Sequence, residues 1–296
     1  MVKLLLMGHQ GQVGQDLQQI LSPFAEVTAV GRSEVDLRQP EQIRQVFAAV
    51  HPEIVVNAAA YTAVDKAESQ MDVAYAVNAA APQVMASEAQ KLGATLIHLS
   101  TDYVFDGSQS HPYQEQDATH PLGVYGQSKL AGEQGVQKMC DRTLILRTAW
   151  VYGVHGKGNF VKTMLRVGRE RTEVRVVADQ VGTPTWSRHI AEAVAALVQA
   201  SAGASDDFYG TYHFTNSGVC SWYDFAIAIF EEAYRLALIS KKPDVIPITT
   251  AEYPTPTQRP SYSVLDHSKI RPILKGHPSH WRVALRQMLK QLKAEV

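Results

Sequence analysis

Short apolar runs alternate with amphipathic stretches along the first half of the chain. The runs, which are rich in Val, Ile, Leu and Ala, are residues 2–7, 26–30, 53–60, 94–100 and 142–147. Runs of this length that end at Gly or polar residues are typical of strands buried on both faces of a parallel sheet. The stretches between them repeat apolar residues at helical spacing, as in residues 12–21 and 125–139. The pattern therefore predicts strands and helices in alternation.

Through residue 150 this alternation predicts an α/β fold with a doubly wound parallel sheet of the Rossmann type. Residues 1–150 are therefore expected to form a nucleotide-binding domain. Beyond them the pattern is less regular, with Pro-bearing loops and additional helices. We interpret residues 151–296 mostly as a smaller substrate-binding lobe. It is interleaved with the last elements of the sheet, which are expected from residues 174–215.

Further elements follow from local spacing. Helices are expected at residues 159–169, 187–200, 221–238 and 280–294, and strands at 173–177 and 211–214. Ser221 is placed to N-cap its helix. A single helix is expected from residue 65 to residue 92, which puts Asn78 in mid-helix, where Asn is unfavourable. Its side chain is then either exposed or buried and bonded to the backbone.

Composition narrows the functional classes. The 296 residues include 45% hydrophobic and 19% charged residues, with a formal net charge of −1, as in ordinary globular proteins. Without a cluster of Lys or Arg, we expect no electrostatic footprint for nucleic acid. Cys140 and Cys220 suit neither a disulfide framework nor a metal site, so we expect reduced thiols in a cytoplasmic protein. The chain starts directly with a strand, and no apolar run approaches ~20 residues, so neither a signal peptide nor a membrane span is expected.

A glycine-rich segment follows the first predicted strand. Gly8, Gly11 and Gly14 are spaced G-x-x-G-x-x-G at the start of the first predicted helix. Glycines permit a tight turn and a close approach of backbone N–H groups, and a helix N-terminus adds partial positive charge. The segment therefore predicts a pyrophosphate-binding loop, and the alternative is an ordinary turn.

The end of the second strand normally meets the adenosine ribose, where an acidic residue selects NAD. Here the chain has Gly31, Arg32 and Ser33. The guanidinium of Arg32 matches a 2′-phosphate in bidentate geometry, which favours NADPH, and the alternative is a solvated arginine. Asp36 is a second candidate contact at the adenine end.

Hydroxyl and amine side chains lie in two further segments. Ser100, Thr101 and Asp102 end a predicted strand, at the sheet edge where ligands of open α/β folds bind. Tyr125 and Lys129 share one face of a predicted helix, about 6 Å apart along its axis. An ammonium near a phenol favours the phenolate and lowers its pKa from the usual ~10. Such a tyrosine donates or accepts a proton near neutral pH.

Two other features have open interpretations. The small residues 58–60 after the third strand let either a cofactor or a helix approach the backbone. Trp150, after the strand at 142–147, is either part of the core or a stacking platform.

Taken together, these segments resemble the dTDP-4-dehydrorhamnose reductases, a family of extended short-chain dehydrogenases/reductases. The resemblance runs essentially end to end and is carried by residues 8–14, 56–68, 100–105, 125–133 and 147–152, and by Arg259, Pro260 and Ser263. It implies reduction of the 4-keto group of dTDP-4-dehydro-L-rhamnose to dTDP-L-rhamnose, the last step of dTDP-rhamnose synthesis. It also implies that residues 1–150 bind NADPH, or NADH, as the hydride donor.

The resemblance also implies residue roles. It matches Tyr125 to the proton donor, Lys129 to its partner and Thr101 to the hydroxyl that orients the substrate carbonyl. Asp102 and Trp150 match substrate contacts. The positions that match cofactor contacts are Gly8, Gly11, Gln12, Val13, Gly14, Arg32, Asp36, Leu37, Ala60, Tyr61 and Thr62, together with Tyr125 and Lys129.

One departure concerns a metal. Some members of the family bind Mg²⁺ at a dimer interface through glutamates, one of them in the first helix. The matching position here is Asp16, a shorter carboxylate, so we carry over neither the metal nor that dimer, and a homodimer stays open.

Two other functions also stay open. One is a different sugar-nucleotide enzyme, such as a 4-ketoreductase, an epimerase or a 4,6-dehydratase. Dehydratases place a Glu after the Thr-Asp pair, where this chain has Tyr103. The other is a non-catalytic regulator, because the regulatory subunit of methionine adenosyltransferase resembles the same family.

Overall fold

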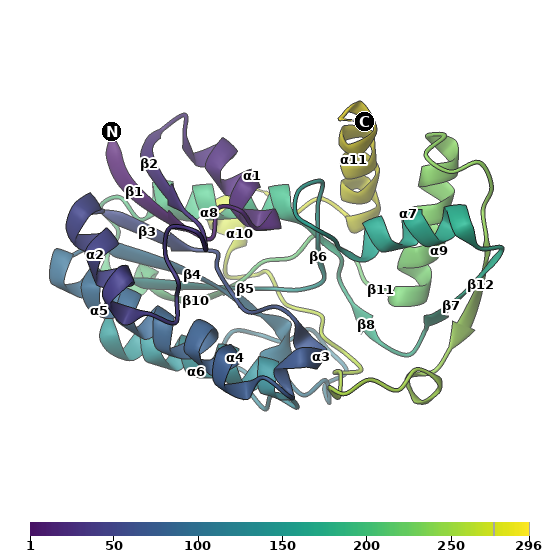
Figure 1. Cartoon of the computed structure of the whole chain (residues 1–296), viewed down its shortest axis with the longest axis horizontal. Helices are drawn as coiled ribbons and strands as arrows, with labels where there is room; N and C mark the ends of the chain where they lie inside the picture. Colours follow the sequence, from purple (N-terminus) through teal and green to yellow (C-terminus); the bar gives the residue numbers. More distant parts are fainter. Residues whose placement is uncertain (275, 296) are drawn as a thin grey trace.

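The computed structural model describes residues 1–274 and 276–295 and is built on a six-stranded parallel sheet (Figure 1). The strand order is β10-β5-β4-β3-β1-β2, and every pairing is parallel. The strands are β1 (Val2–Met7), β2 (Ala25–Val30), β3 (Ile54–Asn57), β4 (Thr95–Thr101), β5 (Thr143–Thr148) and β10 (Gly210–His213). The prediction of a doubly wound parallel sheet is confirmed.

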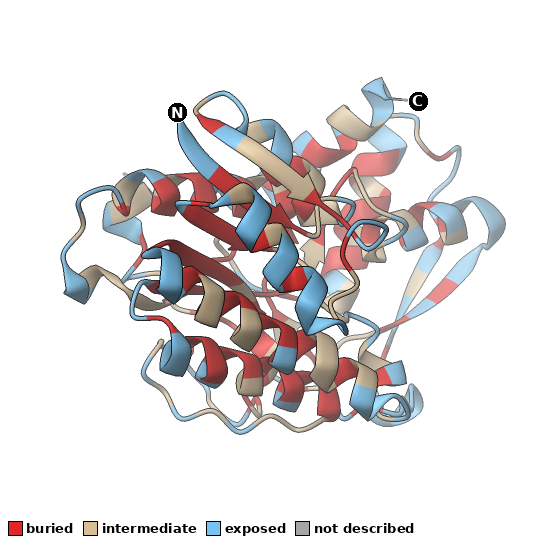
Figure 2. Cartoon of the chain, turned by 60° about the vertical axis from the view of Figure 1, so that its left-hand side comes forward, coloured by how far each residue is buried: buried red, intermediate tan, exposed pale blue. Residues whose placement is uncertain are grey.

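Helices cover both faces of the sheet, which explains why apolar residues predominate in the middle of its strands. One face carries α1 (Gln12–Leu21) and α8 (Ser187–Ala200), and the other carries α2 (Pro40–Val50), α5 (Ala81–Leu92) and α6 (Val124–Met139). Successive residues of β1 point to opposite faces, so Leu4 and Leu6 join one core and Leu5 and Met7 join the other. Figure 2 shows buried residues along the strands and exposed residues on the outer turns of the helices.

The strand order fixes where a ligand is expected. The chain runs from β1 outward to β2 and then crosses back to β3, on the other side of β1. Open α/β sheets bind ligands at this switch point, beyond the carboxyl ends of the strands. The last residues of β1 and β3, Met7 and Asn57, lie side by side, and Asn57 also pairs with His98 of β4.

The single helix predicted from residue 65 to 92 is wrong. The structure has α3 (Val64–Ala67), α4 (Met71–Tyr75), a π-helical segment η1 (Ala76–Ala80) and α5. The buried Asn78 in η1 accepts from the Tyr61 backbone N–H at 2.8 Å and donates to the Tyr61 carbonyl at 3.1 Å. Of the two interpretations of Asn78, the buried side chain bonded to backbone is therefore confirmed. π-Helical turns of this kind often occur near functional sites.

A second group of elements has its own core (Figure 1). It contains α7 (Phe160–Glu170), α9 (Trp222–Arg235), α11 (Trp281–Ala294) and the parallel pair β7 (Glu173–Val177) and β12 (Asp244–Ile248). Strand β10 joins the large sheet, as expected for a later element within residues 174–215, whereas β7 pairs with β12 and not with that sheet. Ser221 N-caps α9 with a capping box, as predicted, but the helix ends at Arg235.

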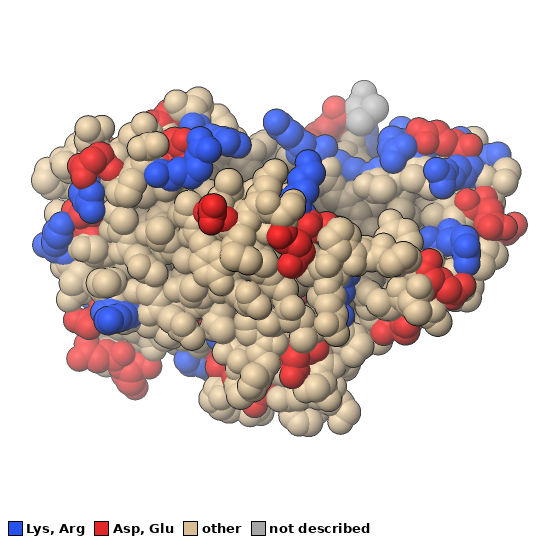
Figure 3. Space-filling view, turned by 60° about the horizontal axis from the view of Figure 1, so that its bottom comes forward, with Lys and Arg blue, Asp and Glu red and all other residues tan. Residues whose placement is uncertain are grey.

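The remaining elements are short. They are β6 (Val151–Tyr152), β8 (Val181–Gly182), β9 (Thr185–Trp186), β11 (Cys220–Ser221), α10 (Arg271–Leu274), η2 (Asp102–Val104), η3 (Asp206–Phe208) and η4 (Thr250–Glu252). Among the described helices, none is both long and apolar enough to cross a bilayer. On the face drawn in Figure 3, acidic and basic side chains are interspersed, several of them near the middle of the face, and other residues form most of the surface.

Candidate active site

The glycine-rich loop connects β1 to α1 in a conformation that requires glycine. Gly8 has φ +86°, and a Cβ on it would lie 2.7 Å from the backbone N of Ala59. A Cβ on Gly14 would lie 2.1 Å from the carbonyl oxygen of Gly8. Gly11 is the N-cap of α1 and brings no capping side chain to its N–H groups. A tight loop with exposed N–H groups at a helix start suits a pyrophosphate.

Gln12 and Val13 follow directly in α1. The side-chain nitrogen of Gln12 donates to the carbonyl of Val151 at 3.3 Å, and its oxygen accepts from Asn159 at 2.7 Å. Gln12 therefore ties the glycine-rich loop to the segment before α7. Val13 packs against the core beneath α1 and α8.

At the end of β2, Arg32 is exposed, while Asp36 is already paired. Asp36 accepts from the guanidinium of Arg38 at 2.6 and 3.0 Å, and these hydrogen bonds lower the pKa of Asp36 to about 2. Glu34, to which the sequence assigned no role, accepts from Gly31 N–H and the Ser33 hydroxyl, each at 2.7 Å. The Gly-x-x-Glu spacing of residues 31–34 is the sequence pattern that could have indicated this hydrogen-bonded turn. Both carboxylate oxygens are bonded within the turn.

The segment after β3 is held by side chains from other elements. The backbone of Tyr61 is bonded to Asn78, and its hydroxyl donates to Gln70 at 2.8 Å. Ala60 and Thr62 flank this anchored residue, and Leu37 packs against the core under α2 and α5. The predicted cofactor positions after β1, β2 and β3 thus all lie at the carboxyl edge of the sheet.

The candidate catalytic residues come from β4 and α6. Thr101 ends β4, Tyr125 is the second residue of α6, and Lys129 follows one turn later. Gly126 lets the helix approach η2, because a Cβ there would lie 2.2 Å from the carbonyl oxygen of Tyr103. The structure therefore brings these three predicted residues to the same end of the sheet.

The pKa values differ from the prediction in one respect. Burial raises the pKa of Tyr125 above its usual range, and hydrogen bonding to Thr101 acts in the opposite direction. Lys129 donates to the carbonyl of Leu99 at 2.6 Å, and burial lowers its pKa to about 8. The expected lowering of the Tyr125 pKa by Lys129 is therefore wrong for this structure, since desolvation dominates.

Several polar atoms at the carboxyl edge of the sheet are buried without a hydrogen-bond partner among the described residues. They include Ser100 Oγ, Asp102 Oδ2 and Thr148 Oγ1, at the ends of β4 and β5. Burial raises the pKa of Asp102 to about 6, although hydrogen bonds to Ser263 and Thr101 oppose the shift. Buried polar groups are normally paired, so these atoms are available to hydrogen-bond a polar ligand.

Trp150 packs against the core of the second group of elements, in a strained backbone conformation. Its φ is +48°, a backbone angle that residues other than Gly rarely adopt. Its ring stacks on that of Trp222, with the ring centroids 3.6 Å apart. Gly182 allows this, because a Cβ there would lie 2.6 Å from the Trp150 ring. Such strain is found most often at functional sites.

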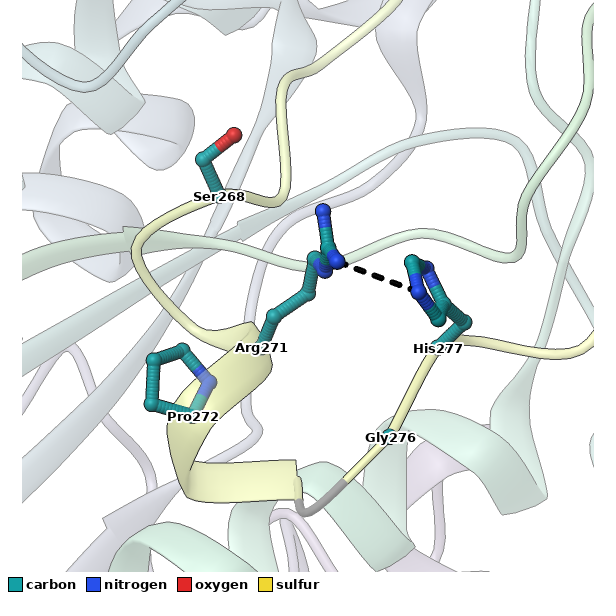
Figure 4. A pocket seen from close by; sticks show the side chains of 5 residues that line it. All are labelled: Ser268, Arg271, Pro272, Gly276 and His277. Carbon is teal, nitrogen blue, oxygen red and sulfur yellow. Dashed lines mark hydrogen bonds between the residues drawn. The ribbon is translucent and has the colours of Figure 1, made fainter.

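A separate surface hollow contains none of these residues. It is lined by Ser268, Arg271, Pro272, Gly276 and His277 at α10 (Figure 4). Arg271 donates to the ring of His277 at 3.0 Å. This hollow is therefore distinct from the predicted site.

Comparison with known proteins identifies the family. Residues 2–294 match the family model described as RmlD substrate binding domain. A dTDP-4-dehydrorhamnose reductase of Aggregatibacter actinomycetemcomitans is 42% identical over 97% of this chain and 98% of its own length. The chain belongs to the dTDP-4-dehydrorhamnose reductase family. This confirms the sequence-based resemblance and the assignment to the oxidoreductases.

Two further relatives support this placement. A spore coat polysaccharide biosynthesis protein of Bacillus subtilis is 41% identical over 98% of both chains. The crystal structure of the dTDP-4-dehydrorhamnose reductase from Bacillus anthracis, in complex with NADP, is 37% identical. It superposes with a TM-score of 0.90 over 98% of this chain and 99% of that one.

The metal site found in some members of the reductase family does not fit this chain. Asp16 is 2% exposed, and it accepts from the hydroxyl of Ser187 in α8 at 2.5 Å. Its carboxylate is therefore used inside the fold, between α1 and α8. Among the described residues, no group of three or more His, Cys, Asp and Glu side chains is placed to hold a metal ion. We derive no step through a metal.

Glu68, to which the sequence assigned no role, caps helix α6. The N-cap residue of α6 is Gly123, which has no side chain to offer. Glu68 Oε1 accepts instead from the backbone N–H of Val124 at 3.0 Å and from the hydroxyl of Thr257 at 3.3 Å. No local pattern reveals this contact, because the partners lie 56 residues apart.

Glu68→Ala is expected to lower the free energy of unfolding by about 1 kcal/mol, the usual value of an N-cap. It should also reduce turnover, since Tyr125 lies in the first turn of the capped helix. Glu68→Gln is the matched control, because its oxygen still accepts from Val124. Urea denaturation and kcat measure both effects. Equal losses in the two variants would assign the effect to the charge and not to the cap.

Proposed function

We propose that this chain reduces the 4-keto group of dTDP-4-dehydro-L-rhamnose to dTDP-L-rhamnose with NADPH, the last step of dTDP-rhamnose synthesis. The observation that supports the proposal is that Thr101 ends β4 and that Tyr125 and Lys129 lie in the first turns of α6, at the end of the sheet that also carries the glycine-rich loop, in a chain of this family. Residues 1–150 would bind the cofactor, and the lobe formed mostly by residues 151–296 would bind the sugar nucleotide.

The residues of the loop fit a dinucleotide. Gly8, Gly11 and Gly14 would hold its pyrophosphate, and the small residues after β3 would lie along it. NADPH, when bound, supplies the hydride for the keto carbon. The NADP complex of the Bacillus anthracis relative supports this choice of cofactor.

The chain's own residues handle the oxygen of the substrate. Thr101 donates a hydrogen bond to the carbonyl oxygen and fixes its position. Tyr125 gives its proton to that oxygen as negative charge develops. The raised pKa of Tyr125 keeps the phenol protonated near neutral pH, as a proton donor requires. Lys129 supports Tyr125 from the next turn of α6.

Two other functions are less well supported. A 4,6-dehydratase needs an acid after the Thr-Asp pair, and Tyr103 occupies that position with a pKa that burial raises to about 12. A non-catalytic regulator would not need the complete set of Thr101, Tyr125 and Lys129. The two cysteines are free and buried, which suits the reducing cytoplasm that we propose as its location.

The test is oxidation of NADPH in the presence of dTDP-4-dehydro-L-rhamnose, with the product identified by mass spectrometry and NMR. We expect dTDP-L-rhamnose. Tight NADPH binding without turnover of any 4-keto sugar nucleotide would identify a regulator instead. Turnover of another 4-keto sugar, but not of this one, would keep the reductase and change its substrate.

Arg32→Ala is expected to weaken the use of NADPH and to leave NADH nearly unchanged. Arg32 is exposed at the end of β2, and both oxygens of Glu34 are bonded within the turn. An exposed ion pair is worth about 1 kcal/mol, so kcat/KM for NADPH should fall about fivefold. Arg38→Ala is the control, because Arg38 is paired with Asp36. Equal losses with both cofactors would show that Arg32 does not bind the 2′-phosphate.

A further inference from the structure

Three buried polar side chains form a polar network behind the candidate active site. Asn57 ends β3, His98 lies beside it in β4, and Lys129 reaches them from α6. Asn57 is 1% exposed, His98 0% and Lys129 2%. Asn57 Nδ2 lies 3.0 Å from His98 Nδ1, and His98 Nε2 lies 3.5 Å from Lys129 Nζ. The proposed mechanism uses Lys129 but neither of the other two.

At the far end of this network lies a backbone hydrogen-bond donor in a fixed position. The backbone N–H of Ala59 donates to Asn57 Oδ1 at 3.1 Å. Ala59 is held in place by Gly8, where a Cβ would come within 2.7 Å of its nitrogen. Because a backbone N–H only donates, the oxygen of Asn57 faces Ala59 and its NH₂ group faces His98.

This orientation of Asn57 sets the tautomer of His98. An NH₂ group donates, so Nδ1 of His98 accepts and carries no proton. Burial lowers the pKa of His98 well below its usual value, so the ring is neutral. A neutral imidazole has one N–H, which is therefore Nε2–H and is directed at Lys129.

The form of Lys129 that fits this donor is the free amine. An ammonium ion has three donors and no lone pair, so it would meet His98 Nε2–H as donor against donor. The free amine keeps N–H groups for the Leu99 carbonyl, at 2.6 Å, and offers a lone pair to His98. We propose that Asn57 and His98 are positioning residues that favour the free-amine form of Lys129 by presenting it with a fixed N–H donor.

The inference rests on the proposed function and adds a step to it. After Tyr125 gives its proton to the sugar oxygen, it is a phenolate. An N–H bond of the Lys129 ammonium breaks, and an O–H bond of Tyr125 forms, directly or through water. Lys129 is left as the free amine, which His98 stabilises, and it regains a proton from solvent. A group whose pKa lies near the working pH passes on a proton with the least loss of driving force.

The other ionisable groups around Lys129 come from three elements. On its own helix, Tyr125 lies one turn before it and Glu133 one turn after it. Glu133 is paired with Arg147 of β5, and Asp102 of η2 faces Tyr125. Glu133 raises the pKa of the lysine, while the larger effect of burial lowers it. The charges of these groups do not depend on which ring nitrogen of His98 carries the proton.

Nitrogen NMR of the protein labelled with ¹⁵N-histidine tests the tautomer directly. We expect the Nε2–H form of His98 at neutral pH, with its signals assigned by their loss in His98→Gln. Asn57→Asp should convert His98 to the Nδ1–H form, because a carboxylate only accepts. A wild-type protein with the proton on Nδ1 would overturn the proposal. Since no substrate is needed, this outcome is independent of whether the proposed reaction occurs.

A second measurement follows the titration of Lys129 by ¹³C NMR of its Cε, assigned with Lys129→Met. Asn57→Asp is expected to raise the titration midpoint of Lys129 by roughly 1–3 pH units. The limb of the pH–kcat profile that depends on Lys129 should move by the same amount. Asn78→Asp is the control, since this buried amide is bonded to Ser128 and not to His98.

The control adds the same charge beside α6 but should leave His98 in the Nε2–H form. An unchanged Lys129 midpoint in Asn57→Asp, or an equal shift in Asn78→Asp, would contradict the proposal. If Asn57→Asp does not fold, the wild-type tautomer still decides.

Discussion

Tyr125→Phe is expected to lower kcat by roughly 10²–10⁴-fold while the affinity for NADPH stays nearly unchanged. The substitution removes the phenol hydroxyl and keeps the ring, which packs in the start of α6 against Tyr103 and Val64. Because burial raises the pKa of Tyr125, the wild-type phenol is protonated below that raised value. The phenol proton of Tyr125 is therefore present throughout the neutral range and is lost only as the pH rises beyond the usual tyrosine range.

Tyr103→Phe is the matched control for this experiment. Its ring lies edge-on to that of Tyr125, with centroids 5.5 Å apart, so both variants lose a hydroxyl from the same region. We expect a loss in kcat/KM far smaller than that of Tyr125→Phe. Near-normal turnover in Tyr125→Phe, measured by steady-state NADPH oxidation, would remove Tyr125 from its assigned role. Equal losses in the two variants would indicate substrate binding instead.

Features set by local sequence could be predicted. Strand β1 and helix α1 have the predicted bounds, because an apolar run, a glycine-rich turn and helical spacing follow one another without competition. The proximity of Thr101 and Tyr125 also follows from local rules, since Thr101 ends a parallel strand and Tyr125 begins the next long helix, at the same edge of the sheet.

Features that depend on distant partners could not be predicted. The π-helical turn at η1 exists because Asn78 bonds to the backbone of Tyr61. The pairing of β7 with β12 joins segments about 70 residues apart, and neither strand contains a signal that names its partner. The pKa of Tyr125 was predicted from Lys129 alone, whereas burial by the whole site decides it.

Helix α6 is also anchored by a buried ion pair that no local pattern indicates. Glu133, two turns after Tyr125 in α6, accepts from Arg147 of β5 at 2.7 and 3.0 Å. The two side chains are 3% and 6% exposed. The guanidinium also lies over the ring of Phe105, 5.1 Å from its centroid. These contacts hold the face of α6 that carries Tyr125 and Lys129 against the sheet.

Arg147→Met is expected to lower the free energy of unfolding by about 3–5 kcal/mol. The methionine fills much of the space but leaves the carboxylate of Glu133 buried without its partner. Most domains are stable by only about 5–15 kcal/mol, so this loss should be visible as a large shift in the urea or guanidinium midpoint. Arg166→Met is the control for a surface pair, because Arg166 and Glu170 are exposed, and it should cost less than about 1 kcal/mol.

A double variant separates the cost of an unpaired charge from the value of the pair. Glu133→Leu combined with Arg147→Met replaces both charges with apolar side chains of similar size. Replacing a buried pair in this way is often neutral, whereas removing one partner strands the other charge. We therefore expect the double variant to be more stable than Arg147→Met alone. If the double variant is less stable, the pair itself stabilises the fold, and the hydrogen bonds between Glu133 and Arg147 outweigh the cost of desolvating both charges.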